Sequence, residues 1–164
     1  MADGGASSFI MLVTALLISG AAGTILIDQW GSAVRVMSDN QQKAEHQSKV
    51  SIDFAGDPMM VIMDSASSND ITIHVLNSGE IEMNTTIFEV YVNGQLPSST
   101  STAISPTGTN WVPGYIMEIT LSDAGYSSLS DNQDIKLFVT ATSEFFGGHT
   151  YTTSFSKEVR LHEI

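Results

Sequence analysis

The chain has 164 residues, the size of one domain with at most a modest additional segment. It carries 18 acidic and 6 basic residues, and a net charge of −12 disfavours nucleic acid or anionic lipid head groups as partners. The absence of cysteine excludes disulfides and thiolate metal sites. Residues 1–49 hold four acids and three bases (net −1), whereas residues 50–164 hold fourteen acids and three bases (net −11).

The first predicted element is a long helix within residues 1–49. No charged residue lies between Asp3 and Asp28, and this run exceeds the roughly 20 residues that a membrane-spanning helix needs. The segment "MADGGASS" lacks the basic residues that open a secretory signal peptide, so we expect the helix to be retained. It predicts a single membrane crossing, with Trp30 near the membrane surface.

A seam of residues spaced alternately four and three apart runs from Phe9 to Ser48, apolar as far as Met37. This period predicts one helix of about forty residues, roughly 60 Å long, that packs against other helices. Ala15, Ser19 and Gly23 are small and lie four residues apart, a spacing that allows helices to approach closely in lipid. In the alternative interpretation the helix is a lone anchor, and its glycines have no role in packing. The residues predicted to pack in the membrane are Phe9, Val13, Ala15, Leu16, Ser19, Gly20, Gly23, Ile27 and Trp30.

Charges beside the span bear on its orientation. Arg35 and Lys43 lie near its C-terminal end, whereas no basic residue precedes it. A positive-inside count therefore places residues 50–164 in the cytoplasm, although Asp28 and Asp39 partly offset this bias.

Residues 50–164 predict a domain of short strands. Seven segments alternate or are rich in β-forming residues: 49–58, 58–63, 70–80, 86–96, 114–122, 134–142 and 149–164. Each of the first six predicts one strand, and the last predicts one or two. Asn93-Gly94 is a strong signal for a hairpin turn, and the Ser/Thr-rich residues 97–110 predict a long loop. The predicted fold is mainly β, a long N-terminal transmembrane helix (1–49) followed by an immunoglobulin-like antiparallel β-sandwich (50–164).

Motifs of catalysis and metal binding are missing from the sequence. There is no G-x-S-x-G elbow, phosphate-binding glycine loop or H-E-x-x-H pair. His46, His74, His149 and His162 are scattered without metal-ligand spacing, and Asp64–Asp70 lacks the order of a calcium loop and predicts a solvated turn. We therefore expect no catalytic, cofactor or metal site and no enzymatic activity.

Two surface features are candidates for modification or contact. Asn84-Thr85-Thr86 is an N-glycosylation sequon, and a glycan at Asn84 would require this domain to lie outside the cell. Phe145 and Phe146 are adjacent at a predicted hairpin tip, so at most one readily faces the core, unless both tuck under the loop. They are the candidate partner contact.

The small-residue helix, followed by "KVSIDFAGDP", "ITIHVLNSGE" and "FEVYVNGQ", resembles the archaellum accessory proteins of the FlaG/FlaF type, the G form more closely. The resemblance extends to about residue 96. It implies a single-pass protein of the cytoplasmic membrane of an archaeon, with an immunoglobulin-like sandwich outside the membrane under the S-layer. That placement overrules the charge count.

This resemblance also implies a role in the archaellum motor. Members form a stator: the G form self-assembles and meets the F form, which binds the S-layer and holds the stationary part while the filament turns. The implied partners are the membrane, further copies of the chain, the F-type paralogue and the S-layer.

Two other functions remain open. The first is a filament subunit of the archaellin or type IV pilin kind, because Asp3-Gly4 before Gly5 weakly resembles a prepilin peptidase site. Against this function, the four-residue leader lacks Lys and Arg, and no Glu follows in the first helical turns. The other is a membrane-tethered extracellular binding module. Loss of assembly on Gly23→Leu would separate both assembling functions from a simple tether.

Overall fold

The computed structural model describes residues 3–65 and 69–164, with side chains from residue 5 onward. The chain divides into two compact units, one up to Ala44 and one comprising Glu45–Ile164. The elements in chain order are α1 (Asp3–Ser48), β1 (Ile52–Phe54), β2 (Val61–Asp64), β3 (Asp70–Asn77), β4 (Met83–Val92), β5 (Ser99–Ser105), β6 (Ile116–Ser122), the short 3-10 helix η1 (Ala124–Ser128), β7 (Asp134–Ser143) and β8 (Thr152–Glu163).

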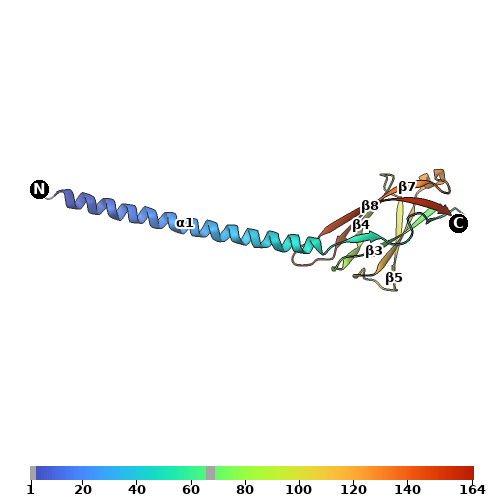
Figure 1. Ribbon diagram of the computed structural model, residues 1–164, viewed down its shortest axis with the longest axis horizontal. Coiled ribbons are helices and arrows are strands. Elements are labelled where there is room, and N and C mark those ends of the chain that lie inside the picture. The colour runs from blue at the N-terminus through green and yellow to red at the C-terminus, as the bar shows by residue number, and fades with distance from the viewer. Residues whose placement is uncertain (1–2, 66–68) are drawn as a thin grey trace. The chain divides into compact units, whose positions relative to one another are not determined.

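The predicted N-terminal helix is confirmed as a single element of 46 residues, about 70 Å long (Figure 1). No proline precedes Pro58, so nothing in the sequence removes a backbone donor from the helical ladder. Its last turn tightens where Lys49 N donates to His46 O at 3.1 Å and Val50 N to Gln47 O at 3.3 Å. The first buried residue of the sandwich, Val50, follows at once.

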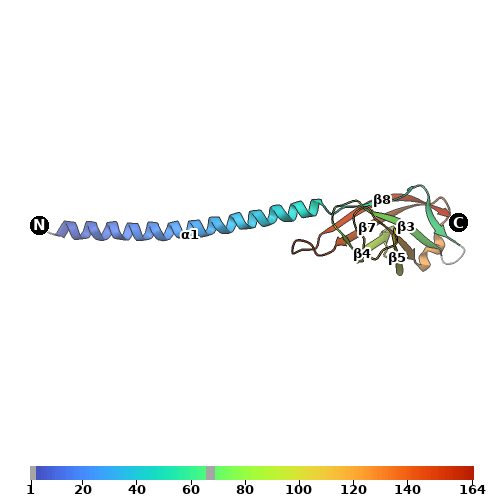
Figure 2. The ribbon, with the colours of Figure 1, turned by 90° about the horizontal axis from the view of Figure 1, so that it is seen from below.

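Two antiparallel sheets make up the second unit (Figure 2). The first sheet has the order β2-β3-β6-β5, with β1 also paired to β3, and the second sheet has the order β4-β7-β8. The C-terminal end of β8 leaves the second sheet and pairs in parallel with β2, so that Val61 faces Leu161 and Met63 faces Glu163. The two sheets therefore share an edge through β8. The predicted mainly-β sandwich is confirmed at this level.

Alternation along the strands places one face of each sheet in a common core. In β3 the residues Ile71, Ile73 and Val75 are buried, while the residues between them are half-buried. Trp111, before β6, is also fully buried and donates its indole N–H to Tyr115 O at 3.1 Å. The predicted strands at 70–77 and 134–142 are confirmed, since burial on alternate sides produces the period of two.

A buried asparagine connects the turn after β3 to the segment before β6. Asn77 is fully buried, and its Nδ2 donates to the carbonyl oxygens of Ile81 at 2.9 Å and Trp111 at 3.0 Å. Its Oδ1 accepts the N–H of Gly79 at 3.1 Å. Trp111 O also accepts Met83 N and Gly79 N also donates to Ser51 O, so the amide is most important for Ile81 O, whose donor it supplies.

Two sequence predictions need correction. The predicted loop 97–110 is wrong over Ser99–Ser105, which form β5 and pair with β6 at seven consecutive positions. The sequence of β5 does not alternate between apolar and polar residues, because its side chains, except the half-buried Ile104, are exposed on both faces of the sheet. The tight turn predicted at Asn93-Gly94 is confirmed: both residues have positive φ (51° and 81°), and Val92 and Gln95 exchange backbone hydrogen bonds across it, both at 2.9 Å. The antiparallel pairing ends there, because β4 belongs to the second sheet and β5 to the first.

The second correction concerns the strand predicted at 58–63. The segment 58–63 forms a strand only from Val61, because Asp57 Oδ1 accepts Met59 N at 2.9 Å and holds a turn before it. The final segment 149–164 forms one strand, β8, of the one or two that were predicted. Of the predicted solvated turn Asp64–Asp70, residues 66–68 lie outside the described part of the chain.

Candidate membrane anchor and interaction surfaces

α1 contains a segment suited to a membrane. Within the described residues it is the one helix long and apolar enough to span a bilayer, with a mean hydropathy of 2.3 in its most apolar window. Thr14 Oγ1 donates to Ile10 O at 2.8 Å and Thr24 Oγ1 to Ala21 O at 2.9 Å. These hydroxyls are therefore satisfied inside the helix and need no partner in lipid. The finding is consistent with single-pass anchoring.

The residues predicted to pack in the membrane are uncovered within their own unit. Phe9, Leu16, Ile27 and Trp30 are each about two-thirds or more exposed, and no atom beyond the helix's local backbone lies within 4 Å of a Cβ built at Gly20 or Gly23. Val13, Ala15 and Ser19 are likewise exposed. Removing so much apolar surface from water requires lipid or another helix.

The last helical turn, from Glu45 onward, belongs to the sandwich unit and is held there by its side chains. His46 Nδ1 lies 3.1 Å from the Tyr151 hydroxyl oxygen, and Gln47 Nε2 donates to Thr152 O at 2.9 Å. The His46 ring also meets the Phe146 ring edge to face, with 4.9 Å between centroids. The sequence offered no signal for these contacts between residues about a hundred positions apart.

Backbone bonds hold the segment after the helix. Glu80 N donates to Lys49 O at 2.8 Å, and Gly79 N donates to Ser51 O at 3.0 Å. A Cβ at Gly79 would collide with Lys49 O and Ser51 N, so glycine is required for this close approach. Residues 49–51 are thereby fixed against the turn that follows β3.

The two candidate partner residues lie in the connection between β7 and β8. Phe145 is 73% exposed and Phe146 is 45% exposed, so neither tucks fully under the loop. Phe146 and His149 exchange backbone hydrogen bonds at 2.9 and 3.1 Å, closing a tight turn through Gly147 and Gly148. Phe146 is engaged with His46, which leaves Phe145 as the freer apolar side chain.

Asn84, the predicted glycosylation position, is engaged at both ends of its amide. Its Oδ1 accepts from Thr86 N and Thr86 Oγ1, both at 2.8 Å, and from Ile87 N at 2.9 Å. Its Nδ2 donates to Glu144 Oε1 at 2.7 Å. These bonds coincide with a shift in the β4–β7 register between Met83 and Phe88.

The outer face of the second sheet carries an open aromatic groove of about 510 Å³. Tyr91 and Phe138 stand beside each other with ring centroids 6.1 Å apart, and Glu89 Oε2 accepts the Tyr91 hydroxyl at 2.9 Å. Lys136 and Ser156 also line it. Aromatic lining with a few polar groups is typical of small binding sites.

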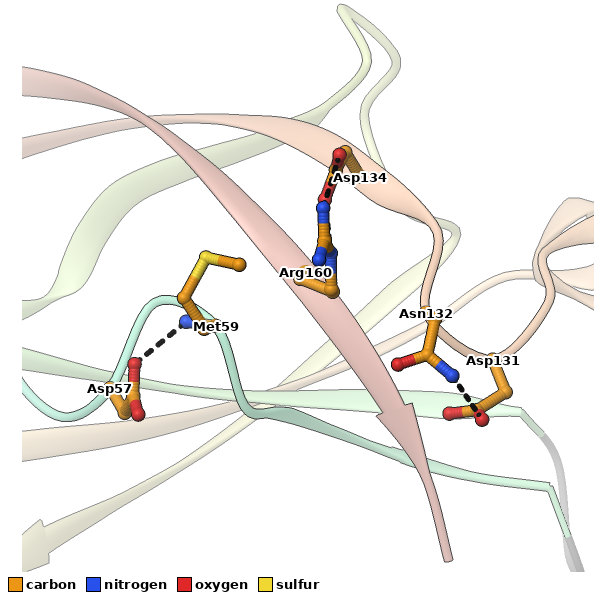
Figure 3. Close-up of polar contacts among 6 residues, drawn as sticks. All are labelled: Asp57, Met59, Asp131, Asn132, Asp134 and Arg160. Carbon is orange, nitrogen blue, oxygen red and sulfur yellow. Dashed lines mark hydrogen bonds and ion pairs between the residues drawn. The ribbon is translucent and has the colours of Figure 1, made fainter.

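Polar contacts between the start of β7 and the end of β8 are structural in kind (Figure 3). Arg160 Nε and Nη2 donate to the two carboxylate oxygens of Asp134 at 2.7 and 2.9 Å across β7 and β8. This hydrogen bonding holds the pKa of Asp134 below its usual value and that of Arg160 above it. Asn132 Nδ2 donates to Asp131 Oδ2 at 2.6 Å in the preceding turn.

The histidines are distributed among different surroundings. His46 and His149 flank Tyr151, with ring centroids 5.8 and 6.4 Å from its ring. His74 lies 3.5 Å from Glu118, and His162 lies 3.5 Å from Asp131. In residues 3–65 and 69–164, no three His, Asp or Glu residues gather as metal ligands.

Comparisons with known proteins add little to this description. No protein-family model matches the chain, and no curated protein matches it. Among solved structures it is similar to the periplasmic chaperone SfaE, at 9% identity and a TM-score of 0.35, over 69% of this chain and 56% of that one. The chain thus spans little more than half the length of that structure, and this likeness carries no functional argument.

Proposed function

We propose that this protein is a membrane-anchored, self-assembling structural component of the archaellum motor, a stator protein whose β-sandwich lies outside the cytoplasmic membrane of an archaeon, under the S-layer. The observation that carries the proposal is the pairing of a long, uncovered apolar helix with a sandwich. The resemblance of residues 1–96 to the FlaG/FlaF type, the G form above all, supplies the cellular setting.

The sandwich is proposed to be immunoglobulin-like. If β1 and β2 are taken together as strand A, then β3, β4, β5, β6, β7 and β8 become strands B to G in chain order. The sheets then read A-B-E-D and C-F-G, which are the two sheets of the constant-type immunoglobulin domain. This order supports the finer fold assignment.

A stator needs an anchor that does not slip and contacts that join its copies. The helix serves the first purpose, because a membrane-spanning segment inserts far more durably than one lipid chain. The uncovered small and apolar residues around Gly23 support packing against other helices. The F-type paralogue and the S-layer are the proposed partners of the sandwich, with Phe145 as a contact.

The proposal is tested in cells by deleting the gene. We expect the deletion strain to lose swimming and to regain it with the wild-type gene. Antibody labelling should place the protein in the cell envelope and not along the filaments. Labelled filaments would favour the filament subunit instead, and an intact mass beginning at Gly5 would support that outcome by revealing peptidase processing.

The aromatic groove on the second sheet favours one further candidate, a tethered binding module. Tyr91 and Phe138 present two exposed or half-exposed rings between polar side chains. A strain that swims normally without this protein, together with a protein that stays monomeric, would favour this function.

A further inference from the structure

We infer that two copies of this chain pair through β5, edge to edge and antiparallel, so that their first sheets become one continuous sheet across a twofold axis. The inference deepens the self-assembly in the proposed function and rests on it, because it names the surface used. It does not depend on the archaellum as the setting.

The first reason is that β5 is a free edge without the usual protection. It pairs with β6 at seven consecutive positions, and no other strand of the described chain lies along its opposite side. Natural sheets guard such edges with charged side chains, prolines or bulges, since exposed backbone donors and acceptors otherwise recruit another strand. The sequence of β5, "STSTAIS", contains no charge and no proline, and its register shows no shift.

The opposite edge of the sandwich provides an internal comparison. β4 ends the second sheet, and there the register shifts between Met83 and Phe88. The side chain of Asn84 already takes up the N–H groups of Thr86 and Ile87, and Glu89 places a charge on the strand. One edge is therefore guarded by a bulge, a side-chain cap and a charge, whereas β5 has none of these.

Charge is the second reason for choosing a copy of the same chain as the occupant. Residues 50–164 carry a net charge of −11, so most surfaces of two copies repel each other. Between Glu89 and Glu118, however, the sequence contains no charged residue, and β5 lies in the middle of this stretch. An antiparallel pair of β5 strands brings together an uncharged strand from each domain, with Glu118, the partner of Ala103 on β6, one strand away from the contact. Charges beyond about 8 Å are screened at physiological salt.

The side chains of β5 fit a self-complementary register. With Thr102 on the axis, Thr102 meets its own copy, and Ser101 meets Ala103 of the other copy. Thr102 and Ile104 stand opposite Ile119 and Met117 of β6 and so continue the core-facing side of the sheet. Cross-strand pairs of threonine and other β-branched residues stabilise antiparallel sheets. No like charges and no bulky side chains oppose each other in this arrangement.

Apolar surface beside the edge would be covered at the same time. Leu96, just before β5, is 58% exposed and lines a hollow of about 200 Å³ together with Phe88 and the first residues of β5. Strand pairing places the neighbouring copy beside this hollow. Backbone bonding thus gives the contact its direction, and apolar burial adds to its stability.

The test uses the full-length protein in detergent and exploits its lack of cysteine. Thr102→Cys should form a disulfide-linked dimer under mild oxidation, because directly opposed residues in antiparallel strands have Cα atoms about 4.5–5.5 Å apart, within disulfide range. Ser154→Cys, on the exposed outer face of β8, is the matched control and should remain largely unlinked. A mixture of Ser101→Cys and Ala103→Cys proteins should form mixed dimers, which fixes the register.

A second variant tests the edge without cross-linking. Ser101→Lys restores a charge guard and should weaken dimerisation at least tenfold in native mass spectrometry, with unchanged thermal unfolding as evidence of an intact fold. Dimerisation of the wild-type protein should strengthen with added salt, since the acidic domains repel each other.

Equal cross-linking of Ser154→Cys, or none at Thr102→Cys in a folded protein, would overturn the inference. If oligomers persist in that case, self-assembly stands and uses another surface. A strictly monomeric protein would contradict both self-assembly and the β5 contact.

Discussion

The Nδ1 atom of His46, in the last turn of α1, lies 3.1 Å from the hydroxyl oxygen of Tyr151, the residue just before β8. The same imidazole meets Phe146 edge to face and fills the space beside Gly147. One histidine thus connects the end of the helix to both sides of the β7–β8 turn, within the sandwich unit.

Gly147→Ala should destabilise the protein more than Gly148→Ala. Both glycines have positive φ (60° and 85°), so each substitution costs roughly 1 kcal/mol or more in backbone strain. Only the new Cβ at position 147 would collide with the His46 ring, because the space beside Gly148 is open. Thermal unfolding of the full-length variants measures the difference, which should shrink when His46→Ala is added. Equal losses would show that the His46 ring yields freely.

Asn77→Ala should cost roughly 2 kcal/mol or more of unfolding free energy. The substitution leaves Ile81 O without its donor and removes one of the two donors to Trp111 O, which keeps Met83 N, and an unsatisfied buried group costs about 1–3 kcal/mol. Asn110→Ala, at an exposed position, should change stability by less than about 0.5 kcal/mol. Denaturant unfolding compares the two. Similar small effects would mean that water replaces the Asn77 amide.

Tyr126→Phe should stabilise the protein and reduce the dependence of its unfolding free energy on pH in the alkaline range. The Tyr126 hydroxyl is buried, and no partner for it occurs among the described residues. Burial first, and the Asp123 carboxylate second, raise the pKa of Tyr126 to about 12. This pKa is higher in the folded state than in the unfolded state, so the neutral Tyr126 side chain makes its full contribution to the free energy of unfolding below about pH 10. That contribution is lost as the pH rises toward 12.

Unfolding at pH 8 and pH 11 measures both effects. The phenylalanine variant should gain about 1 kcal/mol at pH 8, since an unpartnered polar group is removed. Its advantage should grow by roughly 1 kcal/mol at pH 11, allowing for solvent screening. A constant advantage at both pH values would contradict the raised pKa.

Gly23→Leu should weaken self-association of the full-length protein in lipid or detergent. A leucine side chain would hold neighbouring helices apart where Ala15, Ser19 and Gly23 allow close approach. Ala21→Leu, on the opposite side of the helix, should have little effect. Energy transfer between labelled copies in vesicles measures association. Unchanged association in both variants would indicate a lone anchor.

Much of the fold follows from periodicity, and the remainder depends on contacts that periodicity does not encode. The strand β3 could be predicted from the alternation of Ile71, Ile73 and Val75 with polar residues, because only one side of that strand is fully buried. The two sides of β5 do not differ in burial in this way, so its sequence "STSTAIS" predicts a polar loop. Only its pairing with β6 identifies it as a strand. The composition of a peripheral strand reflects solvent on both of its faces.

The candidate site divides in the same way. The uncovered residues of α1 were predictable, because membrane helices follow length and hydropathy alone. The contact of His46 with Tyr151 was not, since it joins residues 105 positions apart through one side chain. Nor does the sequence order of β4 and β5 reveal that a tight turn separates them into different sheets.

The parallel pairing of β2 with β8 has a mechanical consequence. A pull between the helix and the C-terminal end acts first on residues 49–51 and β1. Once these are released, it draws β2 by its first residue and β8 by its last, in opposite directions along one ladder. The ladder is then loaded in shear, so its hydrogen bonds resist together instead of opening one after another as in peeling. Tension along the chain therefore meets the sandwich in its stiffer direction.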